Sequence, residues 1–298
     1  MRIGYLIDAF PTLSETFISR EVLSLRRMGQ DIIVWAFKRP SSDTLTRYSP
    51  EMLALTDDVH YVSNLQVLNE LSRSPLRCTR PEVASLNAQI QRAAVMKSNP
   101  YARLLRACAV ANQAERLAVK HLHAHWPYAS QIAALAHRMT GVTYSVSIHA
   151  HEVAHDNGHF PIVFQTLAFA TFCNRAAMEY ALAQLPDECR ARSHLIYHGV
   201  NIEDFSPSSL PTPYRPLRLL SSGRLTRTKG FGRLVAGCAR AHQAGVDLEL
   251  TVLGDGRLYE ELKSQAQKLG FAERLHMPGW VPYSEVHNYL AQAHAFVL

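Results

Sequence analysis

The sequence predicts an α/β protein with two open parallel sheets, and three observations support this prediction. Short apolar runs alternate with amphipathic helical stretches along most of the chain. The alternation stops at the proline-rich segment 206–213 and then starts again. The length of 298 residues also exceeds that of one ordinary domain. We therefore expect two Rossmann-like domains, residues 1–213 and 214–298, that face each other across a cleft.

The first domain opens with a predicted strand, helix and strand over 3–7, 17–28 and 32–37. Gly29 stands where a glycine commonly ends a helix. Thr12 and Ser14 offer N-cap hydroxyls, and Glu15 stands three residues after Thr12, the spacing of a capping box. This is the opening unit of a parallel sheet.

The other elements continue the same alternation. Residues 80–120 are mainly helical, with a break at Pro100. The rest of the first domain predicts strands over 121–126, 144–149, 171–174 and 194–197, and helices over 128–139 and 175–185. The second domain predicts strands over 217–221, 248–253, 275–277 and 295–298, and helices over 231–243, 258–269 and 285–291. Because it ends on a strand, we expect this domain to be incomplete, with an open sheet edge.

Composition favours a cytoplasmic protein. Hydrophobic residues make up 47% and charged residues 19% of the chain, as in ordinary folded domains. The five cysteines are scattered and show no CxxC spacing, which predicts reduced thiols. The N-terminus does not resemble an export signal, and no apolar run approaches the ~18 residues needed to span a bilayer.

Basic charge is concentrated between residues 73 and 120. Nine basic residues face only two acidic ones there; the basic residues are Arg73, Arg77, Arg80, Arg92, Lys97, Arg103, Arg106, Arg116 and Lys120. Such a stretch is typical of a solvated helix surface, which is the favoured interpretation. The alternative is peripheral contact with an anionic lipid surface, at the inner face of the cytoplasmic membrane, or with a phosphorylated acceptor. Aromatic residues are not interleaved with these charges, so nucleic acid is not expected as a partner.

Ligands of open parallel sheets bind outside the carboxyl ends of the strands. The strongest cluster at such an end is segment 222–231, SGRLTRTKGF. Arg224 and Lys229 bracket a loop between a predicted strand and a helix that begins near Gly230. Two cations beside the positive end of a helix suit a diphosphate. A basic loop in solvent is the alternative for this segment.

Seven segments carry motifs that lie in a fixed order along the chain: 10–18, 123–126, 147–152, 197–205, 223–231, 252–256 and 277–281. In this order they resemble the motifs of the retaining family 4 glycosyltransferases, also described as glycosyl transferases group 1. The resemblance extends to their exopolysaccharide branch, which includes colanic-acid-type enzymes, and it covers nearly the whole chain. It implies a GT-B fold with two facing domains.

The resemblance implies a hexose transfer from a nucleotide-diphosphate sugar to a polysaccharide or lipid-linked saccharide, with no further cofactor and no metal. Catalytic roles fall to His149, Arg224 and Lys229. The donor is expected to contact Gly223, Arg224, Lys229, Gly254, Asp255 and Gly256. The acceptor is expected to contact Pro11, Ser14, Glu15, Thr16 and His125.

Two departures from the family pattern affect the expected activity. The family's Glu-x7-Glu pair, which binds the donor sugar and ribose, would lie beyond Leu298. Glu152 stands where this branch has Asp. We therefore expect a truncated glycosyltransferase, and the sequence does not decide whether this chain is active. The alternative is a non-catalytic fragment or binding module.

The histidines support an alternative prediction of function. His121, His123 and His125 alternate and so share one face of a strand. Together with His149, His151 and His155 they would suit a metal-dependent hydrolase. Few carboxylates accompany them, and helices should cover that face, so this remains the alternative. A dinucleotide-binding oxidoreductase is not favoured, because the Gly254-x-Gly256 pair lacks the third glycine of its fingerprint.

Overall fold

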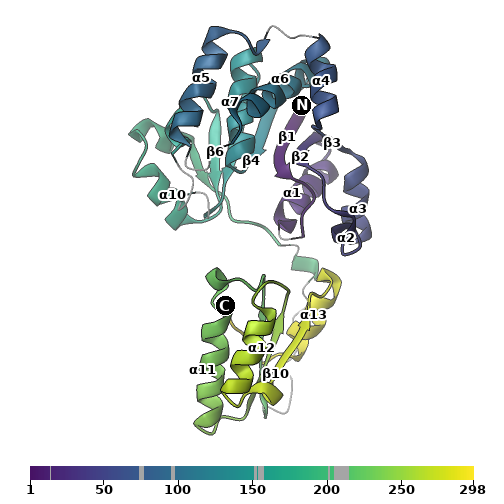
Figure 1. The fold of residues 1–298 in the computed structure, drawn as a ribbon, viewed down its shortest axis with the longest axis vertical. Coiled ribbons are helices and arrows are strands. Elements are labelled where there is room, and N and C mark those ends of the chain that lie inside the picture. The colour runs from purple at the N-terminus through teal and green to yellow at the C-terminus, as the bar shows by residue number, and fades with distance from the viewer. Residues whose placement is uncertain are drawn as a thin grey trace. The chain divides into compact units, whose positions relative to one another are not determined.

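In the computed structural model the chain folds into two units, Met1–Gly199 and Val200–Leu298, which can be followed in Figure 1. The structure describes residues 1–13, 15–73, 77–94, 98–150, 153, 158–200, 202–204 and 215–298. The predicted domain boundary at 213/214 and the proline-rich segment 206–213 lie outside the described residues. So do Ser14, His151, Glu152, His155 and Asp156.

The first unit is built on a seven-stranded parallel sheet. Its strands are β1 (Arg2–Ala9), β2 (Asp31–Lys38), β3 (Val59–Tyr61), β4 (His121–His125), β5 (Thr143–Ile148), β6 (Phe169–Phe172) and β7 (Ser193–Leu195). Their order is β3-β2-β1-β4-β5-β6-β7. The order reverses between β1 and β4, as in Rossmann sheets, and ligands of such sheets bind beyond the carboxyl ends of the strands at this reversal.

Helices connect these strands. They are α1 (Thr16–Arg27), α2 (Ser42–Leu45), α3 (Pro50–Asp57), α4 (Asn64–Arg73), α5 (Pro81–Ala93), α6 (Pro100–Arg116), α7 (Pro127–Thr140), α9 (Phe160–Val163) and α10 (Arg175–Leu182). Proline stands in the first turn of several of them, where its missing N–H costs no hydrogen bond. Asn99 caps α6 by accepting from Tyr101 and Ala102, and Gly141 ends α7 with a left-handed φ of 77°.

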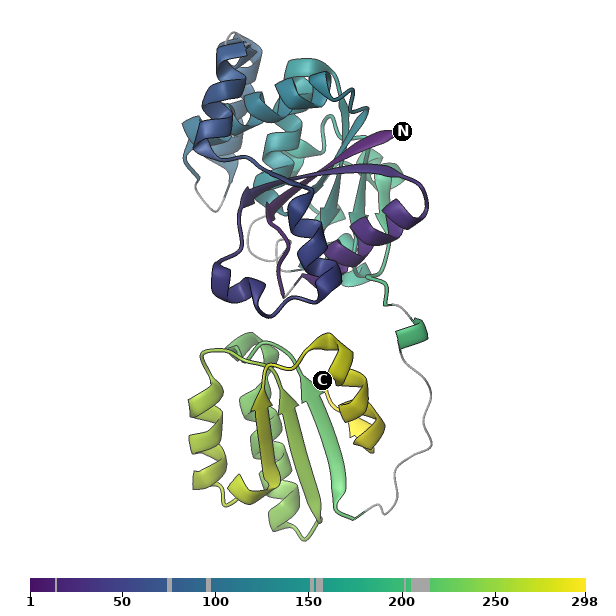
Figure 2. The same cartoon turned by 90° about the vertical axis from the view of Figure 1, so that its right-hand side faces the viewer.

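Strand β1 is buried on both faces because its side chains alternate between two cores. Leu6 belongs to a cluster with residues of α6 and α7. Tyr5 and Ile7 belong to a second cluster with Ile18 and Val22 of α1. Helices therefore lie on both faces of the sheet, which Figure 2 shows from the side, and this leaves the carboxyl edge of the strands for the loops.

The second unit repeats this plan on a smaller scale. Its parallel sheet has the order β10-β9-β8-β11, built from β8 (Leu217–Ser222), β9 (Leu248–Leu253), β10 (Leu275–Gly279) and β11 (Ala295–Phe296). Its helices are α11 (Phe231–Gln243), α12 (Tyr259–Lys268) and α13 (Tyr283–Gln292). Phe231 and Val235 of α11 pack with Leu250 and Val252 of β9 in one core. The predicted α/β class with parallel sheets is confirmed in both units.

The structure corrects one expectation from the sequence and adds elements that the sequence did not predict. Helix α1 begins at Thr16 with Glu15 at its N-cap, and no side chain caps it. The capping box is therefore not formed: the Glu15 carboxylate instead accepts from Trp126 Nε1 at 3.2 Å. The stretch that holds α2, α3, β3 and α4 was not predicted.

No helix within the described ranges combines the length and apolar character that a membrane crossing requires.

Candidate functional site

The carboxyl edge of the first sheet gathers three side chains from neighbouring strands. His125 is the last residue of β4, His149 follows β5 directly, and His198 lies three residues beyond β7. Strands β4 and β5 are in register with His125 opposite Ser147, so their ends coincide. The sequence predicted His125 and His149 at this edge, and the structure brings them together.

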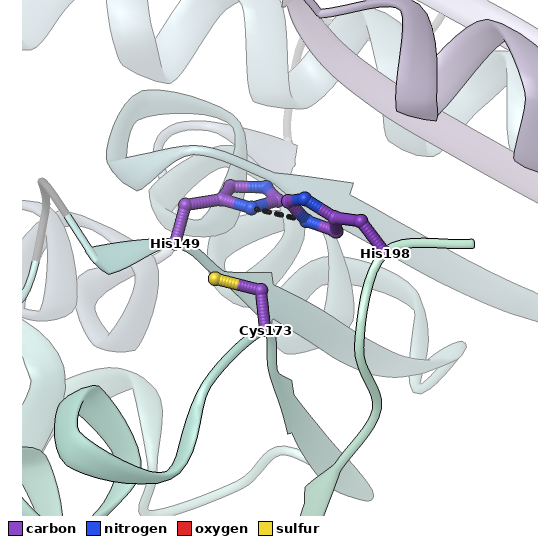
Figure 3. Close-up of side chains that lie close together, drawn as sticks. All are labelled: His149, Cys173 and His198. Carbon is purple, nitrogen blue, oxygen red and sulfur yellow. Dashed lines mark hydrogen bonds between the residues drawn. The ribbon is translucent and has the colours of Figure 1, made fainter. Parts of the chain in front are cut away.

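Hydrogen bonds join these imidazoles into a chain. His125 Nδ1 lies 3.3 Å from His149 Nε2, and His149 Nδ1 lies 3.2 Å from His198 Nε2. The second pair is drawn in Figure 3. Burial lowers the pKa of His149 to about 3, and it lowers the pKa of His125 well below the ordinary value. Near pH 7 both rings are therefore neutral, and they offer hydrogen bonds rather than positive charge.

Two aromatic rings flank the histidines. Phe17 of α1 stacks on His198, with ring centroids 3.9 Å apart and an interplanar angle of 9°. Trp126 lies against His149 at 4.4 Å between centroids. Trp126 has a φ of 76°, a conformation that non-glycine residues rarely adopt and that often occurs at functional sites. Aromatic faces beside neutral hydrogen-bonding groups suit a sugar ring.

The predicted acceptor loop lies at the same edge. Glu15 receives the Trp126 hydrogen bond, and Thr16 opens α1. Pro11 is buried, and its carbonyl oxygen accepts a hydrogen bond from the Tyr48 hydroxyl. This hydrogen bond helps to fix the loop. Ser14 is outside the described residues. Nothing in these contacts tests acceptor binding, which stays a prediction.

Asp8 belongs to this edge although the sequence analysis did not select it. It stands near the carboxyl end of β1, and its Oδ1 accepts from Ala129 N in the first turn of α7 at 3.1 Å. Burial raises the pKa of Asp8 to about 7, against the opposing effects of this hydrogen bond and of Lys38 and Arg106. The sequence around Asp8 does not indicate a functional residue, because the hydrogen bond to Ala129 depends on how β1 and α7 pack.

The alternating histidines of β4 share one face, as predicted, and His123 and His125 are buried. Most of their nitrogens bind hydroxyls: His121 Nε2 and His123 Nδ1 each lie 2.7 Å from Ser145 Oγ. The carboxylate of Glu21 on α1 lies 3.9 Å from the Nε2 atoms of both His123 and His125. The sequence did not indicate Glu21, because its proximity to His123 and His125 depends on how α1 packs against the sheet.

Potential metal ligands group in two places within the described residues. One group is Glu21, His123 and His125; the other is His149, Cys173 and His198. Cys173 directly follows β6, whereas the sequence predicted it inside a strand over 171–174. Neither group is the six-histidine set that the sequence suggested, since His151 and His155 lie outside the described residues.

In the second unit, three strand ends are joined into one platform. Gly223 N donates to Leu253 O at 2.9 Å, Leu225 N donates to Asp255 O at 2.9 Å, and Gly254 N donates to Gly279 O at 2.8 Å. The loops after β8, β9 and β10 are therefore held together by their backbones. The predicted donor residues 223–224 and 254–256 lie side by side.

Gly254 and Gly256 make this joining possible. A Cβ on Gly254 would lie 2.0 Å from Gly223 O, and one on Gly256 would lie 2.7 Å from Leu225 O. Both residues also have positive φ values, 132° and 152°. The structure thus gives both glycines a role in loop packing. The expected contact of Gly254, Asp255 and Gly256 with the donor stays a prediction.

The two predicted cations lie on this platform. Arg224 and Lys229 are exposed, and the described parts of the chain record no hydrogen bond or ion pair for either side chain. Lys229 ends a short 3₁₀ turn, Gly230 has a φ of 75°, and α11 begins at Phe231. First-turn amides of an α-helix lack intrahelical acceptors and carry partial positive charge. This arrangement suits an anion of two phosphates.

Comparison with solved structures defines the class of fold. A lipopolysaccharide outer core galactosyltransferase, WaaB, matches with a TM-score of 0.64 and 16% identity over 99% of this chain and 73% of that one. The Anabaena protein HepE in complex with UDP matches with a TM-score of 0.66 and 16% identity over 98% of this chain and 72% of that one. The fold is that of GT-B glycosyltransferases.

Sequence comparison then finds a family and named relatives. Residues 203–298 match the family model described as "Glycosyl transferases group 1". A putative colanic acid biosynthesis glycosyltransferase of Salmonella typhimurium is 22% identical over 100% of this chain and 75% of its own length. An amylovoran biosynthesis glycosyltransferase of Erwinia amylovora is 32% identical over 34% of this chain and 25% of its own length.

Proposed function

We propose that this chain is a retaining glycosyltransferase that moves a hexose from a nucleotide-diphosphate sugar to a polysaccharide or lipid-linked saccharide in exopolysaccharide biosynthesis. The exposed pair Arg224 and Lys229, on the platform beside the start of α11, is the observation that carries the proposal. Relatives named for colanic acid and amylovoran biosynthesis support the pathway. A structure of related fold in complex with UDP supports a uridine nucleotide.

The two cations act on the leaving group. When the bond between the sugar and the diphosphate breaks, negative charge grows on the phosphate oxygens. Arg224 can hold two of these oxygens with its planar guanidinium, and Lys229 adds a compact charge. Interactions that strengthen as charge develops lower the barrier more than they tighten substrate binding. This assigns catalysis to Arg224 and Lys229 and needs no metal or further cofactor.

His149 and His125 would contact sugar hydroxyls from the first unit. Their neutral rings exchange hydrogen bonds with hydroxyls without placing a charge beside them. Trp126 and Phe17 provide the apolar surface that a hexose ring packs against. Pro11, Glu15 and Thr16 shape the loop at the same edge, where the acceptor would enter.

Binding and transfer can be measured separately. The exposed cations Arg224 and Lys229 predict that the chain binds UDP. Mass spectrometry of products from a panel of UDP- and GDP-sugars measures the transfer and identifies the hexose.

Calorimetric titration with UDP tests the platform directly. Arg224→Ala and Lys229→Ala should each weaken UDP binding about 10- to 100-fold, since a charged hydrogen bond contributes roughly 1.5–3 kcal/mol. Arg240→Ala, which removes an exposed cation at the far end of α11, is the matched control and should bind normally. Equal affinity in all four proteins would refute the assignment.

Peripheral membrane contact through residues 73–120 also stays a prediction. Several of its cations have internal partners: Arg77 pairs with Glu115, Arg116 pairs with Glu70, and Arg103 is fully buried. Arg92 and Lys120 are exposed. Co-sedimentation with vesicles that contain anionic lipid tests this contact, and its loss in an Arg92→Glu, Lys120→Glu variant would support it. Binding that is absent, or unchanged in that variant, would contradict it.

A further inference from the structure

Three adjacent strands deliver metal-binding side chains to one point. His149 follows β5, Cys173 follows β6 and His198 follows β7, and these strands are neighbours in the sheet. One ligand atom of each residue lies within 4.8 Å of the other two. Figure 3 shows Cys173 close to the two imidazoles, on one side of the pair. We propose that His149, Cys173 and His198 form a binding site for Zn²⁺.

The spacing of the two imidazoles fits zinc. His149 Nδ1 and His198 Nε2 are 3.2 Å apart. Two nitrogens bound to tetrahedral zinc at about 2.0–2.1 Å are separated by about 3.3 Å. Zinc can therefore replace the proton between these nitrogens with little movement of the rings. Each imidazole stays neutral with its proton on the other nitrogen, and Cys173 releases its thiol proton to solvent.

The surroundings orient the ligands as metal sites require. When zinc takes His149 Nδ1, the remaining N–H at Nε2 points to His125 Nδ1 at 3.3 Å. Cys173 Sγ accepts from Asn174 Nδ2 at 3.6 Å, and Asn174 is itself fixed as the N-cap of α10. Such partners hold zinc ligands in place and strengthen binding. His198 is exposed, so water can occupy the fourth position.

The other ligand group is less suitable. His123 Nε2 already lies 2.9 Å from Ser147 Oγ, and Glu21 Oε1 accepts from Tyr5 OH at 2.7 Å. A metal there would have to displace both hydrogen bonds, and the group contains no sulfur ligand. Zinc accepts thiolate and imidazole readily. The His149, Cys173 and His198 group is therefore the better site.

Zinc would act as an inhibitor, and this consequence rests on the proposed function. His149 cannot bind zinc and still contact a sugar in the same way. Micromolar Zn²⁺ should therefore lower transfer, and a chelator should restore it. Zinc-insensitive transfer would overturn the inhibitory role, whereas metal binding is measured without any nucleotide sugar and is judged separately.

Cobalt titration of the purified, reduced chain tests the site, because Co²⁺ bound to thiolate gives a charge-transfer absorption band. We expect one Co²⁺ per chain with this band, displaced by one equivalent of Zn²⁺. Cys173→Ser should lose the band, and His198→Gln, a change at an exposed position, should weaken Zn²⁺ binding at least tenfold. Cys78→Ser is the matched control, since both thiols are partly exposed. It should behave like the unmodified chain.

Circular dichroism of each variant checks the fold. The proposal is overturned if the unmodified chain shows no sulfur band with cobalt. It is equally overturned if folded Cys173→Ser and His198→Gln bind zinc as tightly as Cys78→Ser does.

Discussion

At the scale of single residues, Gly254 shows how the absence of a side chain shapes the donor-side platform. Its Cα lies so close to the loop after β8 that a Cβ would meet Gly223 O at 2.0 Å. The atom it would meet is backbone, which is held by the Gly223–Leu253 hydrogen bond and cannot rotate away. The platform and Arg224 therefore depend on this position staying glycine.

We predict that Gly254→Ala destabilises the second unit by more than ~2 kcal/mol and weakens UDP binding, because the clash and the φ of 132° act together. Gly237→Ala is the matched control: it lies inside α11 with open space around its Cβ position. Alanine there should stabilise the unit by up to about 1 kcal/mol. Urea denaturation measures both, and equal effects would contradict this account.

Asp8 gives a prediction about pH. Its pKa is about 7 in the folded chain, well above the value near 4 of an unfolded carboxyl. Unfolding therefore releases a proton between pH 4 and pH 7, and Asp8 lowers stability increasingly as pH rises through this window. Asp8→Asn keeps an oxygen for the Ala129 hydrogen bond and removes the titration.

We expect Asp8→Asn to match the unmodified chain near pH 4 and to exceed its stability above pH 7, by at most about 4 kcal/mol. Denaturation curves at pH 4.5, 6 and 8 measure the difference. Asp57→Asn, at an exposed position, is the control and should stay within about 0.5 kcal/mol. A difference that does not grow with pH would show that Asp8 ionises as freely in the fold as in the unfolded chain.

At the scale of elements, Arg103 joins three helices of the first unit. Its side chain is fully buried on α6. It donates to Asn87 of α5 at 2.8 Å, to Gln131 of α7 at 3.2 Å and to Ser98 at 2.8 Å. Neutral amides and a hydroxyl thus hold a buried cation, and each would lose a partner if the guanidinium were removed.

We predict that Arg103→Ala destabilises the first unit by about 3–5 kcal/mol, because it leaves buried polar groups unsatisfied and creates a cavity. Arg138→Ala, at an exposed position in the last turn of α7, should change stability by less than about 1 kcal/mol. Thermal unfolding of the two variants separates them. Similar melting curves would mean that the three helices pack without help from this cation.

The elements show what the sequence could and could not predict. The residue ranges of α11 and β9 were predicted as observed, because apolar periodicity, Gly230 and flanking turn residues agree there. Strand β3 and helix α2 have three and four residues, too few to show a period. The start of α1 was predicted to within one residue, but the capping box was wrong. Trp126, more than a hundred residues away, donates a hydrogen bond to the Glu15 side chain.

The candidate sites follow the same division. His125, His149, Arg224 and Lys229 were selected because the carboxyl ends of parallel strands gather at one edge of each sheet, a rule that needs only the strand assignments. Their roles stay predictions. Cys173 was missed because β6 ends two residues before the predicted strand did. Asp8 and Glu21 could not be found from spacing, since each depends on how a helix packs against the sheet.

At the scale of the whole molecule, each unit has its own reversal of strand order and its own polar edge. The first unit offers neutral imidazoles, aromatic rings and a thiol. The second offers exposed cations beside the start of a helix. These chemistries differ. We therefore expect ligands that carry phosphate to bind the second unit, and metal ions that accept thiolate and imidazole to bind the first.

Hydrogen exchange measured peptide by peptide tests this division. UDP at 100 times its Kd should stabilise the state that binds it by about 2.7 kcal/mol. Because the amides of the platform are tied together through Gly223, Leu225 and Gly254, we expect UDP to slow exchange over residues 223–230 and 254–256. Zn²⁺ should slow exchange in peptides that contain His149 or Cys173. Arg224→Ala should reduce the UDP stabilisation to about 0.4–1.4 kcal/mol at the same nucleotide concentration and leave the Zn²⁺ effect intact. Two outcomes would show that the platform does not hold the diphosphate. UDP could slow exchange only in peptides of the first unit, or it could slow exchange in Arg224→Ala to the same extent as in the unmodified chain.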